Sequence, residues 1–270
     1  IVINALTAVS TAGIPLPTTG YTSTIYVKAG VYSEILPISI PENCAIVGDE
    51  LRSTVIQPTG GYTTSNMFYM RNGSGLRNCT LQGLSGTLGS ANSYGTQRPT
   101  AGAYVSLDPG TGVDDASVWI SRRSPYVQNV TTFGSGAIGL KVDGALHAGG
   151  NQSIVANDFT QVIDNGIGAW ITNNGRAELV SVFTYYAHIG YLAENGGKIR
   201  ATNGNNSYGK FGSVAESVNS TETPITATVN NRALQAQVGS TFTSGAVVYR
   251  LEYSNAGNAY PNSGTSFTFN

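Results

Sequence analysis

Apolar and polar positions recur with a fixed short period in the second half of the chain. Residues 168–189 can be laid over residues 190–211 without a gap, and a third copy opens at Gly212. The apolar positions then fall in register, as shown by Trp170, Leu192 and Val214. A fixed period of 22 residues, with turn residues at fixed offsets, is typical of a solenoid whose units bury their apolar faces against one another. At about 3.3 Å per extended residue, such a unit holds two or three short strands and no helix. The pattern predicts one turn, or rung, of a parallel β-helix.

Similar alternation extends toward the N-terminus. Residues 24–58 contain several stretches in which apolar and polar positions alternate, separated by Gly, Pro or Asn. This pattern predicts further strands with one buried face. Gly102 and Gly139 open segments that resemble the start of the repeat, at spacings of 37 and 29 residues. The residues in excess of one period predict loops that leave the stack. We place these loop insertions near 84–100, 108–117 and 144–150, where small and polar residues are concentrated.

The two ends of the chain depart from the repeat. In residues 1–20, apolar positions have helical spacing before a Gly and a Pro, which predicts a short N-terminal capping helix. The parallel β-helix is predicted for residues 21–218. Residues 219–270 are interpreted as a linker and alternating strands, forming either a small cap or part of a second β domain. The chain starts without Met or a basic signal region, so we expect a processed or excised piece.

Three Asn residues precede strands that end in Gly, and we interpret Asn43, Asn78 and Asn129 as equivalent corners of successive rungs. Asn tolerates a left-handed backbone, and stacked Asn amides can form a ladder. The same alignment places Cys44 beside Cys79, at an inter-strand spacing of about 4.8 Å that a disulfide tolerates. The alternatives are a disulfide and two buried thiols, because an inward Cys is a common small core residue.

The composition excludes several classes of function. Charged residues are only 11% of the 270 residues, against about 25% in an average soluble domain, and the net charge is −1. Binding to nucleic acid or to an anionic membrane is therefore not predicted. No apolar run is long enough to cross a bilayer, so we predict no membrane insertion. The two Cys lack close Cys or His neighbours, and we predict no metal and no cofactor.

The repeat stacks one pair of carboxylates. Glu194 and Glu216 occupy equivalent positions, so carboxyls that faced solvent would lie about 5 Å apart, close to the separation in retaining glycosidases. This spacing is automatic for any stacked pair, so the alternative is a solvated column without catalysis. Glu178 stacks over Arg200 in the same way, which predicts a structural ion pair between rungs.

Aromatic residues are concentrated between positions 183 and 208. We consider Tyr185, Tyr186, Tyr191 and Tyr208 as candidates for glycan binding, because an exposed aromatic ring offers a sugar an apolar face and a polar tip. The register stacks Tyr186 over Tyr208. The alternative is core packing or a subunit interface, because strand alternation turns about half of such side chains inward.

The runs IYVKAGVYSE, IPENCAIVGD and STVIQP resemble the opening coils of pectin-lyase-like right-handed β-helix proteins and are closely similar to the start of pectin methylesterases. The resemblance implies a right-handed, single-stranded parallel β-helix of the all-β class. The catalytic segments of the methylesterase and polygalacturonase patterns do not occur, apart from the unsupported pair Asp114 and Asp115. The catalytic residues of these families are therefore not transferred to this chain, and a secreted pectin-type enzyme is not favoured.

A second resemblance covers about residues 20–218. The block VSVFTYYAHIGYLAENGGKIRATNGNNSYGKFGSVAES, with CAIVGDELRSTVIQP before it, is similar to β-helical virion proteins of tailed bacteriophages, particularly contractile-tailed phages of marine cyanobacteria. The resemblance implies a tail-fibre, tailspike or baseplate component, usually a homotrimer, in the extracellular virion. Its expected partners are other virion proteins and host-surface polysaccharide, without catalysis. The alternative is a tailspike-type polysaccharide depolymerase with Glu194, Glu216, Asp114 or Asp115 as its carboxylates.

Overall fold

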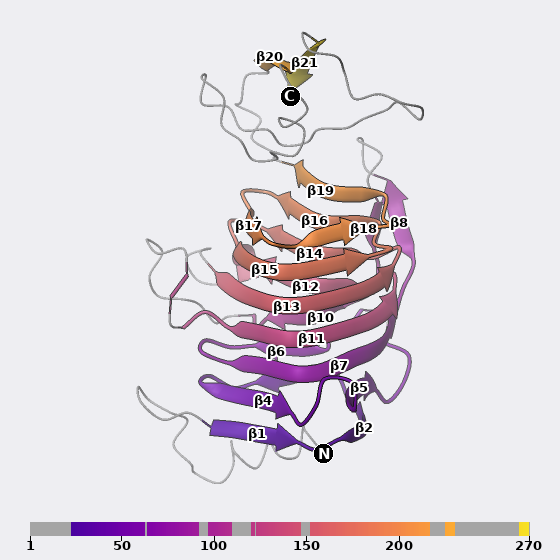
Figure 1. The fold of residues 1–270 in the computed structure, drawn as a ribbon, viewed down its shortest axis with the longest axis vertical. Coiled ribbons are helices and arrows are strands. Elements are labelled where there is room, and N and C mark those ends of the chain that lie inside the picture. The colour runs from indigo at the N-terminus through magenta and orange to yellow at the C-terminus, as the bar shows by residue number, and fades with distance from the viewer. Residues whose placement is uncertain are drawn as a thin grey trace.

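The computed structural model describes residues 23–62, 64–91, 97–109, 120–121, 123–146 and 152–216, and the backbone of 225–229 and 265–269. These residues form an all-β structure dominated by two long parallel sheets (Figure 1). The capping helix predicted in residues 1–20 lies outside the described residues.

Each large sheet is a stack of short parallel strands. Sheet A stacks β1 (Ser23–Val27), β4 (Cys44–Gly48), β7 (Gly75–Ser85), β11 (Tyr126–Ser135), β13 (Ser153–Asp164), β15 (Arg176–Tyr185) and β17 (Lys198–Thr202). It also includes β2 (Gly30–Glu34), β5 (Thr54–Pro58) and β18 (Asn205–Ser207). Sheet B stacks β3 (Ile38–Ile40), β6 (Phe68–Met70), β10 (Ala103–Leu107), β12 (Ile138–Asp143), β14 (Ile167–Thr172), β16 (Ile189–Glu194) and β19 (Phe211–Glu216).

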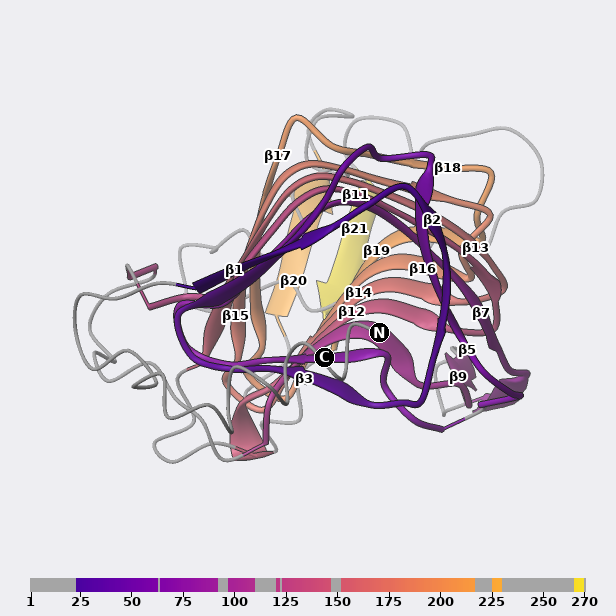
Figure 2. The ribbon, with the colours of Figure 1, turned by 90° about the horizontal axis from the view of Figure 1, so that it is seen from below.

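The chain passes from one sheet to the other and back in each repeat unit, so that each strand pairs in parallel with its equivalent one unit later. The pairing confirms the predicted register, since Trp170 pairs with Leu192, and Leu192 pairs with Val214. Ala177 likewise pairs with Ile199. Seen along the stack, the strands superpose around an enclosed interior (Figure 2). This arrangement is compatible with a β-helix.

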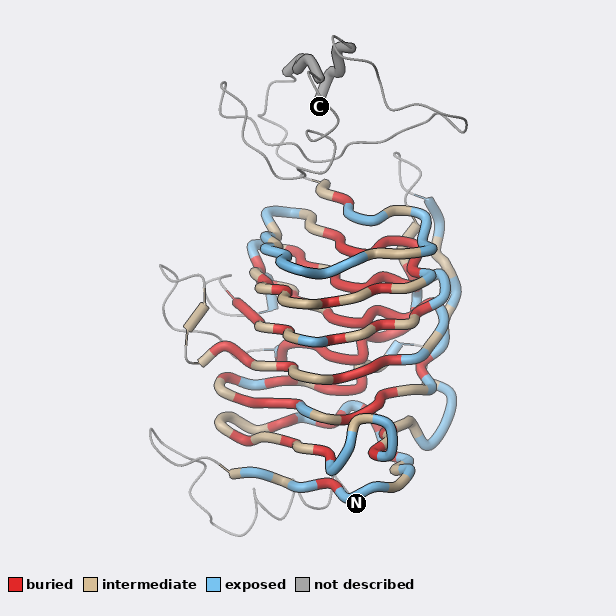
Figure 3. Tube along the Cα trace, viewed as in Figure 1, coloured by how far each residue is buried: buried red, intermediate tan, exposed pale blue. Residues whose placement is uncertain are grey.

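Alternation of side chains fills the interior. Ile46, Leu76 and Val127 are neighbours in register on β4, β7 and β11, and all three are fully buried. Figure 3 shows buried residues recurring along both sheets through most of the stack, whereas β17 and β18 have none. Full burial of one such side chain stabilises the fold by roughly 1.5–3 kcal/mol. The stacked apolar columns therefore explain why the period of the sequence becomes the period of the structure.

A glycine recurs at the opening of the repeat because there is no room for a side chain. Gly139, Gly168 and Gly190 occupy equivalent positions, and a Cβ on each would overlap the backbone oxygen of the next glycine in the column. The last of these oxygens belongs to Gly212. Glycine recurs at this position because the neighbouring strand lies too close for a side chain, and not because the backbone is left-handed there.

Corner residues form part of the predicted Asn ladder. Asn78 and Asn129 have φ values of 54° and 52°, and Asn129 Nδ2 donates to Asn78 Oδ1 at 3.1 Å. Asn43 also has a positive φ, of 54°, but it belongs to another corner, where its N–H donates to the carbonyl of Asn72 at 3.0 Å. The predicted equivalence of Asn43 with the other two corners is therefore wrong.

The predicted adjacency of Cys44 and Cys79 is also wrong. Ala45 on β4 pairs with Gly75 on β7, so Cys44 lies one residue before that pair, whereas Cys79 pairs with Val130 on β11. The reason is that β7 is opposed by two separate strands, β4 along its first half and β5 along its second. Both Cys are buried free thiols.

The earlier repeat units are less regular than the sequence match indicated. Val105 pairs with Leu140, a spacing of 35 residues, so the predicted match of Gly102 with Gly139 was two residues out of register. The match of Gly139 with Gly168 is confirmed by the pairing of Leu140 with Ala169.

The structure describes the predicted loops in part. The insertion near 84–100 contains an antiparallel pair, β8 (Leu88–Ala91) and β9 (Gln97–Pro99). The insertion near 144–150 begins with a 3-10 turn, η1 (Gly144–Leu146), and most of 108–117 lies outside the described residues.

In the C-terminal region, β20 (Ile225–Val229) and β21 (Thr265–Phe269) form an antiparallel pair. The strands predicted between them lie outside the described residues.

Candidate functional site

The β8–β9 pair leaves the stack and contacts strands that come much later in the chain. In Figure 1, β8 runs along the edge of the stack beside the later repeat units. Gln97 and Arg98, both from β9, form hydrogen bonds with His188, Glu194 and Glu216. Residues separated by 91 to 118 positions are thereby brought together on the outer face of sheet B.

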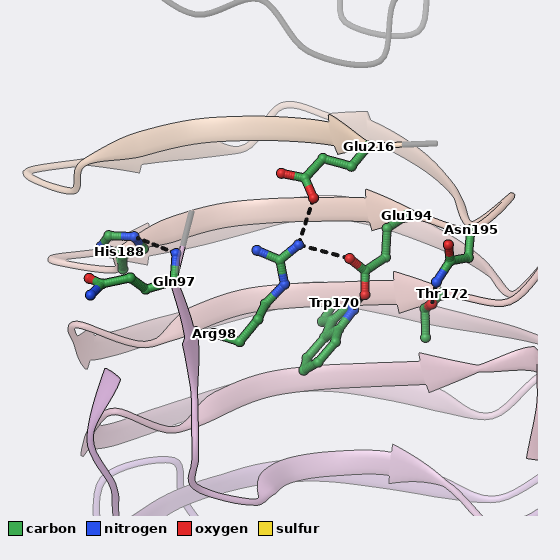
Figure 4. Close-up of polar contacts among 8 residues, drawn as sticks. All are labelled: Gln97, Arg98, Trp170, Thr172, His188, Glu194, Asn195 and Glu216. Atoms are coloured by element: carbon green, nitrogen blue, oxygen red, sulfur yellow. Dashed lines mark hydrogen bonds and ion pairs between the residues drawn. The ribbon is translucent and has the colours of Figure 1, made fainter. Parts of the chain in front are cut away.

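Arg98 joins the two carboxylates that the sequence predicted as a catalytic pair. Its Nη2 donates to Glu194 Oε2 and to Glu216 Oε2, each at 2.8 Å (Figure 4). Glu194 Oε1 accepts a further hydrogen bond from Trp170 Nε1 at 2.7 Å. The two carboxylate side chains are only 15% and 11% exposed, and that of Arg98 is 22% exposed. The prediction that Glu194 and Glu216 stack is confirmed, but the solvated column that was its alternative is wrong, because Arg98 covers them.

Aromatic and apolar contacts surround this ion-pair cluster. The guanidinium carbon of Arg98 lies 5.9 Å from the centre of the Trp170 ring, and Lys141 Nζ lies 4.8 Å from the same centre. Leu192 and Val214 continue the column of Trp170 and are buried. Shielding from water strengthens the charged hydrogen bonds of Arg98, so the cluster holds β9 against sheet B.

His188 provides a second attachment point for β9. Its Nε2 accepts the backbone N–H of Gln97 at 3.4 Å, and its ring meets Phe211 edge to face at 5.6 Å. His188 is buried. Burial lowers the pKa of His188, and the positive charges of Lys210 and Arg98 lower it further. The neutral imidazole, which is the form able to accept the Gln97 N–H, is therefore favoured.

The geometry does not suit hydrolysis by Glu194 and Glu216. A retaining glycosidase needs one carboxylate that can attack the sugar and another that can transfer a proton. Here one guanidinium nitrogen of Arg98 binds an oxygen of each carboxyl, and the indole N–H of Trp170 donates a hydrogen bond to the second oxygen of Glu194. The arrangement is that of a structural clasp, which we call the Arg98 clasp, formed by Arg98, Glu194, Glu216 and Trp170.

The tyrosine candidates separate into exposed and buried residues. Tyr186 and Tyr208 are 50% and 79% exposed, and their rings stack with centres 5.5 Å apart at 21°, as the register predicted. Tyr185 is partly buried. Tyr191 is buried, its hydroxyl donates to the carbonyl of Val182 at 2.6 Å, and burial raises its pKa to about 12. Tyr191 therefore belongs to the interior, and its candidacy as a surface glycan contact is wrong.

The remaining sequence predictions have mixed outcomes. Asp114 and Asp115 lie outside the described residues. The ion pair between Glu178 and Arg200 is confirmed at 3.5 Å. In the part of the chain that the structure describes, no three His, Cys, Asp or Glu side chains are grouped as a metal site would require. No helix among the same residues is long and apolar enough to span a bilayer.

Sequence reasoning missed Arg98 because no spacing rule connects an inserted segment to a distant repeat unit. One indirect signal was present. Stacked Glu194 and Glu216 are like charges at neighbouring positions, which is destabilising unless a cation lies between them. Two like charges at these positions indicate a basic residue nearby, but they do not identify which of the 14 Lys and Arg supplies it.

No protein-family model, no curated protein and no solved structure matches the chain.

Proposed function

We propose that this chain is a right-handed parallel β-helix that acts as a structural and adhesive component of a tailed-phage virion, without catalysis. Its two long parallel sheets and the regular pairing of successive units support the scaffold part of the proposal. A quasi-linear stack of this kind presents an extended lateral surface to partners. In this proposal the chain forms a homotrimer in the extracellular particle and contacts other virion proteins.

The Arg98 clasp is the observation that carries the non-enzymatic part of the proposal. The two carboxylates best placed by the repeat for glycoside hydrolysis are both bound to one guanidinium nitrogen. A cation with two carboxylate partners at 2.8 Å stabilises the attachment of β9. A structural role therefore accounts for these residues, and a depolymerase would have to use other groups.

The stacked pair Tyr186 and Tyr208 supports the adhesive part. Both rings are exposed at successive corners of the stack, where they offer a sugar two adjoining apolar faces with little loss of side-chain entropy on binding. Host-surface polysaccharide is the partner that fits this surface in the proposal.

Retention of the purified chain on cells tests the adhesive function. Fluorescently labelled chain is expected to be retained by cells of a susceptible marine cyanobacterium, and excess unlabelled chain should displace it. Tyr186→Ala with Tyr208→Ala should reduce retention, whereas Arg200→Gln, on another part of the surface, should leave it unchanged. Retention equal to that of an unrelated protein of similar charge would contradict an adhesive role. The oligomeric state is a separate test: the mass of the purified chain in solution, measured by light scattering, should be that of a trimer.

A further inference from the structure

A groove on the outer face of sheet A lies apart from both the Arg98 clasp and the tyrosine pair. It has a volume of about 720 Å³, within the range of about 300–1,000 Å³ typical of small-ligand sites. It crosses β1, β4, β7 and β11, whose outward side chains form two columns. The first column holds Thr24, Ala45, Gly75 and Tyr126. The second column holds Tyr26, Val47, Arg77 and Gln128.

The floor of the groove is open because its central residues are small. Gly75 and Ala45 lie side by side, between the larger side chains of Thr24 and Tyr126. A Cβ on Gly75 would meet the Ala45 Cβ at 3.5 Å and the Arg77 Nε at 3.8 Å, which are ordinary van der Waals contacts. In contrast to Gly168, where a Cβ would overlap backbone, packing does not require glycine at position 75. The hollow is therefore larger than the fold needs.

Arg77 is the one residue with a formal charge among those that line the groove. Its guanidinium carbon lies 5.6 Å from the centre of the Tyr126 ring, and the residue is exposed. Arg71, Arg98 and Arg200 each form an ion pair with a carboxylate within 4.0 Å. Among the described residues, no carboxylate forms such a pair with Arg77. A planar guanidinium with free donors binds a ligand carboxylate through paired hydrogen bonds.

The other lining groups suit a sugar. Tyr26 is 74% exposed, and the partly exposed Tyr126 stands at the far end of the groove. Two aromatic rings provide apolar surface for the faces of sugar rings. The hydroxyl of Thr24 and the amide of Gln128 supply uncharged donors and acceptors for sugar hydroxyls.

From this geometry we infer that the groove over β1, β4, β7 and β11 binds a carboxylate-bearing glycan segment, with Arg77 on the carboxylate and Tyr126 against a sugar ring. The inference rests on the proposed adhesive function and adds a second contact for the same class of partner. The groove faces outward from sheet A, whereas the Arg98 clasp lies on sheet B, so binding there leaves the clasp untouched.

Titration calorimetry with defined oligosaccharides tests the inference. The acidic probes are hexasaccharides of galacturonate, mannuronate and hyaluronan, and the neutral probes are maltohexaose and chitohexaose. We expect at least one acidic probe to bind more tightly than both neutral probes. Arg77→Gln should weaken that binding by about tenfold or more, because the charge-assisted pair is lost. Tyr126→Ala should also weaken it.

Gly75→Val provides the sharpest variant, because it fills the groove from a strand position that has room for a Cβ and favours a β-branched residue. Binding should be abolished while the midpoint of thermal unfolding stays the same or rises. Arg200→Gln is the matched control, because it removes an exposed guanidinium outside the groove, and it should bind the acidic probe as the natural chain does. The inference is overturned if no acidic probe binds, or if binding survives both Arg77→Gln and Gly75→Val. Binding of the acidic probe that is lost in Tyr208→Ala but retained in both groove variants would overturn the groove and leave the proposed adhesive function standing. Cell retention that Arg77→Gln does not change would have the same consequence.

Discussion

Arg98 and Glu216 are 118 positions apart in the sequence, and their side chains form an ion pair of 2.8 Å between Nη2 and Oε2. The contact connects a segment inserted between early strands of the stack to β19, the last of the described strands of sheet B. Glu194 on β16 binds the same nitrogen. The Arg98 clasp therefore ties β9 to two successive repeat units, and the energetics of this tie can be measured.

Arg98→Gln should lower the free energy of unfolding by about 2 kcal/mol, because two poorly exposed carboxylates would then face each other without a cation. Arg200→Gln is the matched control, since the Arg200 side chain is 61% exposed in its pair with Glu178, and the change should cost less than about 1 kcal/mol. Urea unfolding of both variants measures the difference. Equal costs for the two substitutions would show that the clasp contributes no more than a surface ion pair.

The stability of the chain should depend on pH through His188. Burial and the neighbouring cations lower its pKa below the ordinary value of 6.5, so near that pH the unfolded chain binds a proton that the folded chain does not. Stability due to neutral His188 is therefore present above about pH 6.5 and is lost as the pH falls below it. The difference in unfolding free energy between the natural chain and His188→Gln should shrink between about pH 7.5 and about pH 5.5. A constant difference over this window would contradict the assignment.

The sequence predicted the features that repeat and missed those that do not. Trp170, Leu192 and Val214 could be aligned because stacking imposes the same spacing on every residue of a unit. The alignment of Cys44 with Cys79 was wrong because it relied on an Asn-Cys dipeptide that occurs at both positions. Such a dipeptide does not indicate that β4 pairs with the first half of β7 and β5 with the second half.

The candidate site was predicted only in its repeated half. Stacking of Glu194 and Glu216 follows from the period, but their partner Arg98 lies in an insertion, where no periodicity constrains the position of a side chain. The groove beside Arg77 was missed for a related reason. Its floor depends on Ala45 and Gly75 being neighbours, and that register is set by tertiary pairing of irregular early units.

The Asn ladder can be separated into hydrogen-bond and backbone contributions at Asn129. Asn129→Gly removes the amide hydrogen bond to Asn78 and should cost about 1 kcal/mol. Asn129→Ala should cost about 2 kcal/mol, because alanine also carries the strain of the left-handed conformation at φ 52°, worth about 1 kcal/mol. Chemical unfolding of the two variants provides the comparison. A glycine variant less stable than the alanine variant would contradict this division.

The two thiols should be chemically silent in the folded chain. Burial raises the pKa of Cys79 to about 12 and also raises that of Cys44, so the reactive thiolate is scarce at neutral pH. We expect a thiol reagent to label neither Cys while the chain is folded, and to label both after unfolding without reductant. Rapid labelling of Cys79 in the folded chain, or fewer than two thiols after unfolding, would contradict the structure.

A structural role without catalysis is tested most directly by incubating the purified chain with polysaccharide of a susceptible host. The release of reducing ends and the ultraviolet absorbance of lyase products are measured. The natural chain should release no more than the level found without protein. The double variant Glu194→Gln with Glu216→Gln should be less stable, because these carboxylates hold Arg98, and should likewise release nothing. Release of reducing ends by the natural chain, lost in that double variant while the fold is retained, would contradict the structural account and establish a depolymerase.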